Sequence, residues 1–286
     1  MTSMTTSPPA PPKNRTLSRP ATVRKSKSPL GTWGPPILVA LGIIAIWYFI
    51  SYVVLDAQRR FLMPPPHEIF TEAFFKPDVF SDIMVALGRT AVVALVGLAI
   101  ATIIGVLWAI AMSQARWVER SLFPYAVVLQ CIPILALVPL IGFWFGFDYP
   151  ARVIVCVLIA LFPMVSNTLF GLQSVDKGQR ELFKLQKASR WTVLTKLELP
   201  AALPAMFAGM RISAGLSVIG AIVGDYFFRR GEPGLGSLIS NYQSRVQSAE
   251  LFAAIIVACL FGVLIFVLFG WIGKRVVGRW YDFSAN

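Results

Sequence analysis

Charged residues are scarce in this sequence. Of its 286 residues, 14% are Asp, Glu, Lys or Arg, whereas 56% are hydrophobic. A soluble domain has roughly 25% charged residues, so the composition excludes an ordinary soluble protein and indicates an integral membrane protein. For such a chain, length does not measure the number of soluble domains.

Residue types that carry catalysis or bind metals are also few. The single histidine is His67, and the three cysteines, Cys131, Cys156 and Cys259, lie in apolar runs without a CxxC spacing. This excludes the usual zinc-site and disulfide patterns. The sequence has no GxxxxGK[ST] phosphate loop, no HExxH and no Ser/His/Asp arrangement. We therefore expect neither an enzyme nor a chain that binds ATP or a metal.

Acidic residues are the scarcer charge, with 14 Asp and Glu against 26 Lys and Arg and a net charge of +12. In a soluble protein this excess would suggest nucleic acid as a partner. Here the basic residues gather in the tails and in short loops between apolar runs. We interpret them as a topology signal in a lipid bilayer, and we expect no nucleic-acid partner.

Long apolar runs dominate the rest of the chain. A membrane-spanning helix needs about 20 mostly apolar residues, and six runs meet this requirement. The predicted spans are residues 35–55, 88–112, 121–146, 151–172, 201–224 and 250–273. The sequence therefore predicts an all-α membrane protein with six transmembrane helices.

The tails predict the orientation of these spans. Residues 1–30 are rich in Pro, Ser and Thr and contain six Lys or Arg but no acid, so we expect a disordered basic tail. Residues 31–286 form the predicted transmembrane domain. Positive residues favour the cytoplasmic side, which predicts cytoplasmic N- and C-termini and a cytoplasmic loop at residues 173–200.

Proline interrupts two of the predicted spans. Pro124, Pro133 and Pro139 lie in the third, and Pro163 lies in the fourth. A proline leaves backbone groups of a spanning helix unpaired, which is tolerated where neighbouring helices or a water-filled cavity satisfy them. These positions are candidates for an irregular, cavity-lining part of the membrane domain.

Polar side chains inside spans are candidates for a solute path. The candidates are Gln130, Ser166, Asn167, Thr168, Arg211, Ser213, Ser217 and Asp225. For the neutral ones, hydrogen bonding between helices is the commoner role. Arg211 could extend its charge toward the cytoplasmic surface, pair with an acid, or attract an anionic solute.

The loop at 173–200 contains the longest charged stretch between spans. Leu182, Leu185 and Ala188 fall on one helical face, and Trp191, Leu194 and Leu197 repeat at intervals of three beyond a turn near Ser189. An amphipathic helical hairpin of this kind fits a groove on a soluble partner. Its basic charge would also suit lipid headgroups, and the pattern alone favours neither.

The same loop resembles the coupling loop of ABC-importer permeases. That family has Glu-Ala-Ala, three residues, Gly, nine residues, Ile, one residue and Leu-Pro. Here Glu181 matches the Glu, Leu197 the Ile, and Leu199–Pro200 the Leu-Pro at the full spacing. Leu182 and Phe183 replace the two alanines, and Lys187 replaces the glycine.

The resemblance covers roughly residues 80–280. The stretches similar to the nitrate/sulfonate/taurine/bicarbonate/thiamine-precursor importer group are ALGRTAVVALVGLAIATIIGVLWAIAM, CIPILALVPLIGFWFG, LFPMVSNTLFGL, LPAMFAGMRISAGLSVIGAIVGDYF and GEPGLG. Asp225 stands where the group usually has Glu near the end of the fifth span.

The resemblance implies a type I importer permease fold in a bacterial inner membrane. It implies a second permease copy, two ATPase subunits that hold ATP and Mg²⁺, and an extracytoplasmic solute-binding protein. The implied ATPase-docking residues are Glu181, Leu182, Leu185, Lys187, Ala188, Trp191, Leu194, Leu197 and Pro200. The candidate path residues are Gln130, Pro133, Pro163, Asn167, Arg211, Ser217 and Asp225.

The implied function is ATP-driven import of a small polar or anionic solute by alternating access. Sulfonates, nitrate, bicarbonate, vitamin precursors and riboflavin-like molecules all remain open. Two other classes are a stand-alone channel or secondary transporter, and a membrane-anchored interaction protein. A secondary transporter would normally offer more spans or an evident repeat.

Overall fold

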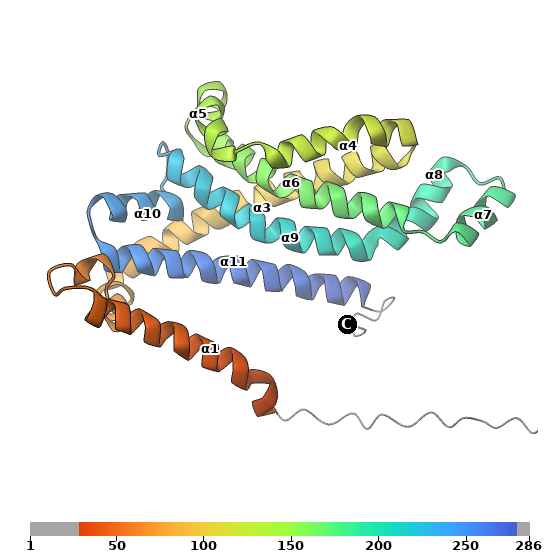
Figure 1. The fold of residues 1–286 in the computed structure, drawn as a ribbon. Coiled ribbons are helices and arrows are strands. Elements are labelled where there is room, and N and C mark those ends of the chain that lie inside the picture. The colour runs from red at the N-terminus through yellow and green to blue at the C-terminus, as the bar shows by residue number, and fades with distance from the viewer. Residues whose placement is uncertain (1–28, 279–286) are drawn as a thin grey trace, which may run out of the picture. The chain divides into compact units, whose positions relative to one another are not determined.

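The computed structural model describes residues 29–278, with side chains described from Gly34 onward, and every regular element in that range is helical (Figure 1). Residues 1–28 of the predicted tail lie outside the described residues, and the first helix begins at Pro29. The chain divides into two compact units, with the boundary after Ile46.

The first helix, α1 (Pro29–Phe49), continues as the π-helix η1 (Ile50–Val54). Residues Gly34–Val54 of this helix are long and apolar enough to cross a membrane. The predicted first span, 35–55, corresponds to this segment. Its residues up to Ile46 are apolar on all faces, as expected of a helix surrounded by lipid.

The second unit begins at Trp47 and contains the remaining helices. Its short elements are η2 (Arg60–Leu62), α2 (Pro66–Ile69), η3 (Phe70–Phe74), α7 (Lys177–Leu185), α8 (Arg190–Val193), η4 (Leu194–Glu198) and α10 (Leu235–Ser244). Its long helices are α3 (Pro77–Ser113), α4 (Arg116–Cys131), α5 (Ile134–Phe145), α6 (Tyr149–Gln173), α9 (Leu199–Phe227) and α11 (Ser248–Val277).

Four of these helices correspond to predicted spans: α3, α6, α9 and α11. The structure corrects the predicted third span, 121–146. It divides this span into two helices, α4 and α5, which meet at 98°. The break falls at Pro133, and Ile132 before it is extended, with φ −67° and ψ 126°. Proline disfavours the helical conformation in the residue before it, so the helix ends there and restarts after Pro133.

The bent pair still runs from one end of the unit to the other. α4 starts next to the end of α3, and α5 packs against the start of α6. With this pair taken as one crossing, the described part of the chain has six candidate spans.

α3, α6 and α9 pack closely at the centre of the second unit (Figure 1). Small residues allow this approach. A Cβ atom at Gly220 of α9 would lie 2.7 Å from the Cα of Cys156 on α6. One at Gly224 would lie 3.1 Å from the Cα of Arg152. α11 packs against α9, and Phe261 and Ile265 of α11 share one buried cluster with α3 and α9.

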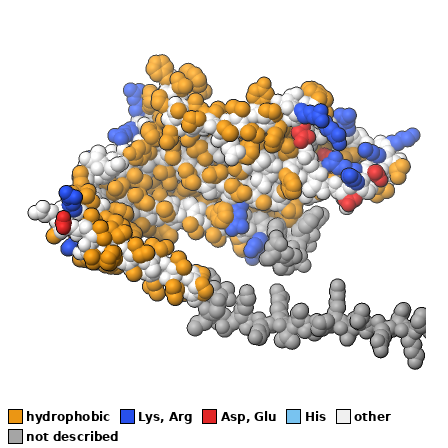
Figure 2. Space-filling view, viewed as in Figure 1, with side chains coloured by type: hydrophobic (Ala, Val, Ile, Leu, Met, Phe, Trp, Pro, Cys, Tyr) orange, Lys and Arg blue, Asp and Glu red, His pale blue; other side chains and the backbone are white. Residues whose placement is uncertain are grey.

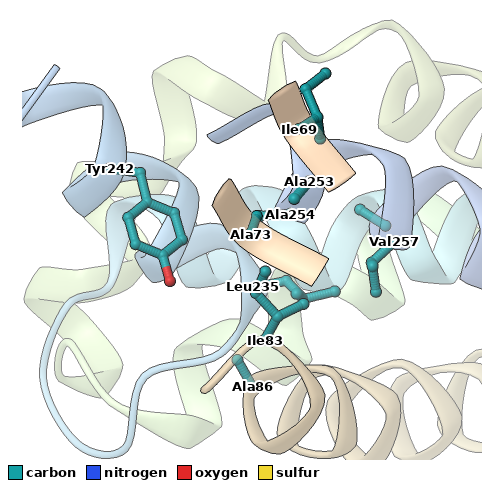
Figure 3. Close-up of a cluster of buried hydrophobic side chains, with 10 residues drawn as sticks. Ile69, Ala73, Ile83, Ala86, Leu235, Tyr242, Ala253, Ala254 and Val257 are labelled. Carbon is teal, nitrogen blue, oxygen red and sulfur yellow. The ribbon is translucent and has the colours of Figure 1, made fainter. Parts of the chain in front are cut away.

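The two ends of this bundle have separate cores. At the end that carries α7 and α8, here the hairpin end, Met112, Leu172 and Leu194 are buried together from α3, α6 and η4. At the other end, here the α10 end, Ile69 and Ala73 pack on Leu235 and Ala253 (Figure 3). This second cluster attaches the segment before α3 to α10 and α11.

The surface of the second unit has an apolar flank and a charged end. Hydrophobic side chains cover most of the long flank of the bundle, whereas Lys and Arg gather over α7 and α8 (Figure 2). An apolar flank with a charged end is the pattern expected of a bundle embedded in a bilayer.

Candidate functional site

The predicted amphipathic hairpin exists, and local side chains set its two helices. Asp176 precedes α7, and its carboxylate accepts a hydrogen bond from Gly178 N at 2.7 Å. Ser189 precedes α8, and its hydroxyl accepts one from Thr192 N at 3.2 Å. Such N-caps satisfy backbone donors that the first turn leaves free. The turn occupies residues 186–189, just before its predicted position.

Lys187 in this turn has φ +50°. This is the left-handed region, which disfavours residues with a Cβ and favours glycine. The lysine therefore sits in a backbone conformation better suited to the glycine that the permease pattern has at this position. The sequence comparison alone does not reveal this strain.

Three large apolar side chains of the hairpin face solvent. Leu185 is 81% exposed, Trp191 72% and Leu182 54%. Leu194, by contrast, is 3% exposed and packs in the core at the hairpin end. The structure thus removes Leu194 from the predicted docking face, because η4 turns it toward α3 and α6. Of the other predicted docking residues, Glu181 and Lys187 are exposed, and Ala188, Leu197 and Pro200 are half-buried.

The base of the hairpin is tied to the spans by one basic side chain. Arg180 on α7 lies 3.3 Å from the Glu198 carboxylate and also donates to the backbone oxygen of Leu172 at 2.8 Å. Glu198 is buried, with 8% exposure. Arg180 therefore connects α7 to the end of α6 and to the start of α9.

Some predicted path residues meet at the break between α4 and α5. A cavity of about 260 Å³, here the bend cavity, is lined by Leu129, Gln130, Ile132, Ile134, Leu158, Ile159, Phe162, Pro163 and Leu216. Pro133 forms the break itself. Asn167 donates its amide to the Pro163 backbone oxygen at 2.8 Å. The lining of the bend cavity thus includes two predicted path residues, Gln130 and Pro163, and Pro133 lies between the lining residues Ile132 and Ile134.

The other predicted path residues lie elsewhere. Ser217 is buried and donates to the Ala214 backbone oxygen of its own helix at 2.8 Å. Arg211 lies on the side of α9 that faces α11, with its guanidinium carbon 4.0 Å from the centroid of the Phe266 ring. Neither residue lines the bend cavity.

Asp225 belongs to a buried polar cluster at the α10 end. Its Oδ1 lies 2.8 Å from the Arg152 guanidinium, and the two side chains are 3% and 5% exposed. The carboxylate also accepts hydrogen bonds from the backbone N–H groups of Gly234 and Ser237 at 3.2 and 2.9 Å. Asp225 thereby satisfies the first turn of α10, and its charge suits the positive end of that helix.

Arg152 holds the loop before α10 from the other side. It donates to the backbone oxygens of Phe228, Arg230 and Glu232 at 2.9, 2.6 and 2.8 Å. Thr90 on α3 accepts from Leu235 N at 2.9 Å. These contacts, with the ion pair to Asp225, define what we call the Arg152 clamp.

No sequence pattern singles out Arg152 as a functional residue. It lies at the second position of a predicted span, where a basic residue is ordinarily an interface anchor. One signal in the sequence points to another role. Arg152 is a basic residue at an end of the span that is predicted to be external, away from the basic cytoplasmic loops. Its partner, Asp225, is 73 positions further along the chain.

Within residues 29–278, no group of three or more His, Cys, Asp or Glu side chains is placed to hold a metal ion.

The spans, the broken helix pair and the projecting hairpin define a multi-pass membrane protein of the permease class. A known family, the binding-protein-dependent transport system inner membrane component, matches residues 101–279. The chain belongs to this family, and it is a permease subunit of an ABC importer.

The chain is similar to permeases of several importers. It is 31% identical over 229 residues to the formylaminopyrimidine transport permease protein ThiX of Halalkalibacterium halodurans, covering 80% of this chain and 89% of that one. It is 30% identical to the putative aliphatic sulfonates transport permease protein SsuC of Escherichia coli, covering 80% of this chain and 85% of that one.

A solved structure of an amino acid ABC transporter with histidines has the same fold. The TM-score is 0.54 at 18% identity, with 71% of this chain and 95% of that chain covered. A MetNI methionine ABC transporter gives 0.52 at 17% identity, with 76% and 98% covered. The type I permease fold expected from the sequence is therefore confirmed.

Proposed function

We propose that the α7–α8 hairpin docks into a groove of a separate ATPase subunit and transmits its ATP-driven closure to the spans. The observation that carries this proposal is the exposure of Leu182, Leu185 and Trp191 on a hairpin outside the apolar flank. Large apolar side chains of this kind serve as anchors in protein interfaces. The ATPase would hold ATP and Mg²⁺, and this chain would bind neither.

The base of the hairpin supports a mechanical role. Arg180 connects α7 to Leu172 at the end of α6 and to Glu198 before α9. A force on the hairpin would therefore reach two central spans through short contacts. Coupling requires an element with two discrete arrangements that both sites bias, and the α6–hairpin–α9 segment is our candidate.

Substitution of the exposed anchors tests the docking. Removing one buried interface anchor costs about 2 kcal/mol or more, which is roughly a thirtyfold loss in affinity. We expect Leu185→Asp and Trp191→Ala each to lower the ATPase that co-purifies with the permease, and solute-stimulated ATP hydrolysis with it.

Lys184→Ala is the matched control, because Lys184 lies on the same helix as an exposed charge. A water-exposed rim charge contributes about 1 kcal/mol or less, so this variant should keep most of its ATPase. If the Leu185→Asp/Trp191→Ala double variant retains bound and coupled ATPase, the hairpin is not the docking element. A lipid-surface role would then replace it.

The proposal places the hairpin end and both chain termini in the cytoplasm, in keeping with the basic loops. Cysteine labelling in cells tests this orientation. A cysteine at Ser174, at the hairpin end, should react only with membrane-permeant reagents. One at Ser244, in α10, should react with impermeant reagents outside, and the reverse result would overturn the orientation.

We further propose that two permease copies, two ATPase subunits and an extracytoplasmic binding protein form the working importer. The solute would be small and polar or anionic, and it would pass the bend cavity near Gln130, Pro133 and Pro163. Relatives named for sulfonates, nitrate, bicarbonate and a formylaminopyrimidine support this range.

Uptake into proteoliposomes with the purified binding protein tests the path. Gln130→Leu should reduce uptake while leaving ATPase association unchanged. Unchanged uptake would show that the bend cavity is not part of the solute path.

A further inference from the structure

An apolar groove runs between α9 and α11. Its volume is about 670 Å³, and its lining residues are Ile212, Gly215, Leu216, Val218, Ile219, Ile222, Ile239, Ile255, Ala258, Cys259, Gly262, Val263 and Phe266. We call it the α9–α11 groove. Glycines keep it deep, since a Cβ at Gly262 would meet only Val218, at 3.9 Å. The groove offers no charged side chain along this length.

The groove continues at the hairpin end into a basic pocket. That pocket, of about 100 Å³, is lined by Pro204, Phe207, Ala208, Arg211, Phe269, Gly270, Gly273 and Lys274. Phe266 links the two, because it lines the groove while the Arg211 guanidinium lies over its ring at 4.0 Å. Together they form a long apolar groove with two basic side chains, Arg211 and Lys274, at one end.

These cations have no ion-pair partner among residues 29–278. Arg211 lies against Gly270, near the hairpin end of α11, and an uncompensated charge within a span is costly. Gly270 lets it lie flat, because a Cβ there would be 3.0 Å from the Arg211 Nε. The cation–π contact with Phe266 compensates only in part.

A second copy of this chain is a poor match for the basic pocket. Two of its acids are already paired, Asp225 with Arg152 and Glu198 with Arg180, and the exposed acids Asp176 and Glu181 lie on the hairpin rather than on a span. A phospholipid of the bilayer supplies what the pocket lacks, because its phosphate is anionic and its acyl chain is apolar. Charge complementarity therefore favours a lipid over a protein occupant.

We propose that the α9–α11 groove binds an anionic phospholipid, with an acyl chain along the groove and the headgroup phosphate at Arg211 and Lys274. The site lies apart from the docking hairpin, and it borders the bend cavity only at Leu216, which lines both. The proposal therefore does not depend on how the ATPase is attached or which solute is carried.

Lipid titration of the full-length permease, purified in detergent and followed by native mass spectrometry, tests the proposal. The probes are dioleoyl phosphatidylglycerol and the zwitterionic dioleoyl phosphatidylcholine. Phosphatidylglycerol should bind more tightly. Arg211→Gln and Lys274→Gln should each weaken its binding about fivefold, the effect of one basic group on an anionic headgroup. Arg116→Gln, a basic residue at the same end outside the groove, should leave it unchanged.

A second pair of variants tests the apolar part. Gly262→Leu should fill the groove and weaken both lipids, whereas Gly88→Leu, on the open surface of α3, should weaken neither. Equal affinity for the two lipids would overturn the proposal, as would full phosphatidylglycerol affinity in the Arg211→Gln/Lys274→Gln double variant.

A second copy in the groove would overturn it too. In a Cys131→Ser background, copper-catalysed oxidation of native membranes would then link two copies through Cys259, which lines the groove. The lipid proposal expects no such link.

Discussion

The two ends of the bundle differ in how tightly their connecting segments are held by buried polar contacts. At the α10 end, the loop before α10 is held by Arg152 and Asp225, both almost fully buried, through backbone oxygens and N–H groups of Phe228 to Ser237. At the hairpin end, Arg180 alone among the described side chains ties the hairpin to the spans by an ion pair. The hairpin's largest apolar side chains remain exposed.

The difference shows where this permease needs a fixed shape and where it needs a free surface. Removing one partner of a buried, hydrogen-bonded ion pair is costly, because it leaves the other charge uncompensated. Exposed leucine and tryptophan side chains leave an interface to be completed by another chain. The loop at the α10 end is therefore fixed by contacts within this chain, whereas the hairpin end leaves apolar side chains exposed for a partner.

The largest effect is expected from a substitution that breaks the Arg152 clamp. Arg152→Gln leaves Asp225 buried without a counter-charge, which should cost about 3–5 kcal/mol of unfolding free energy. Thermal unfolding of the purified permease measures this as a lower Tm. Arg89→Gln removes a more exposed ion pair to Glu232 at the same end and should cost about 1 kcal/mol or less.

Adding Asp225→Asn to Arg152→Gln removes the remaining buried charge and should restore part of the lost stability. Equal, small losses for Arg152→Gln and Arg89→Gln would contradict the clamp. The two ends would then be fixed to a similar degree.

A smaller effect is expected where α10 approaches α9. A Cβ at Gly236 would lie 2.2 Å from the Ile222 backbone oxygen and 2.5 Å from Tyr226 N. Gly236→Ala must move α10 away and should cost about 1–3 kcal/mol, again measured as Tm. Gly88→Ala, where nothing lies within 4 Å, is the control and should not destabilise. An unchanged Tm for Gly236→Ala would mean that α10 is not tightly fixed.

The smallest effect concerns the hairpin turn. Lys187→Gly relieves a left-handed conformation worth about 1–2 kcal/mol but adds flexibility costing roughly 0.5–1 kcal/mol. The net gain should be below about 1 kcal/mol and local to the hairpin, so hydrogen exchange of residues 177–193 is the suitable measurement.

Glu181→Gly, in the middle of α7, is its matched control and should increase exchange, because glycine weakens a helix interior by about 1 kcal/mol. The two substitutions should therefore act in opposite directions. Faster exchange in both would show that the turn at Lys187 carries no strain.

The spans and the hairpin could be predicted because each depends on neighbouring residues. Twenty apolar residues in a row require a helix in lipid wherever they lie in the fold. The exposed face with Leu182 and Leu185 on α7 follows from helical periodicity. Pro133 indicated an irregular third span, but its 98° bend depends on how α4 and α5 pack against α3 and α6.

The polar residues were harder to predict, because their roles depend on partners far away in the chain. Asp225 was predicted to lie near a solute path, yet it meets Arg152 and the start of α10. Leu194 shares the spacing of the exposed stripe, yet η4 turns it into the core. A residue's type and its position on a helix do not state which neighbour that helix will face.

The sequence by itself determined that this chain is a helical membrane protein, where its spans lie, and that an amphipathic hairpin interrupts them. Local rules suffice for these features, since lipid demands internally bonded helices and periodicity places apolar side chains on one face. Tertiary structure alone decided that Arg152 and Asp225 meet, that Leu194 is buried while Leu185 is not, and that Arg211 faces α11. Each of these outcomes depends on contacts between helices that the order of residues does not specify.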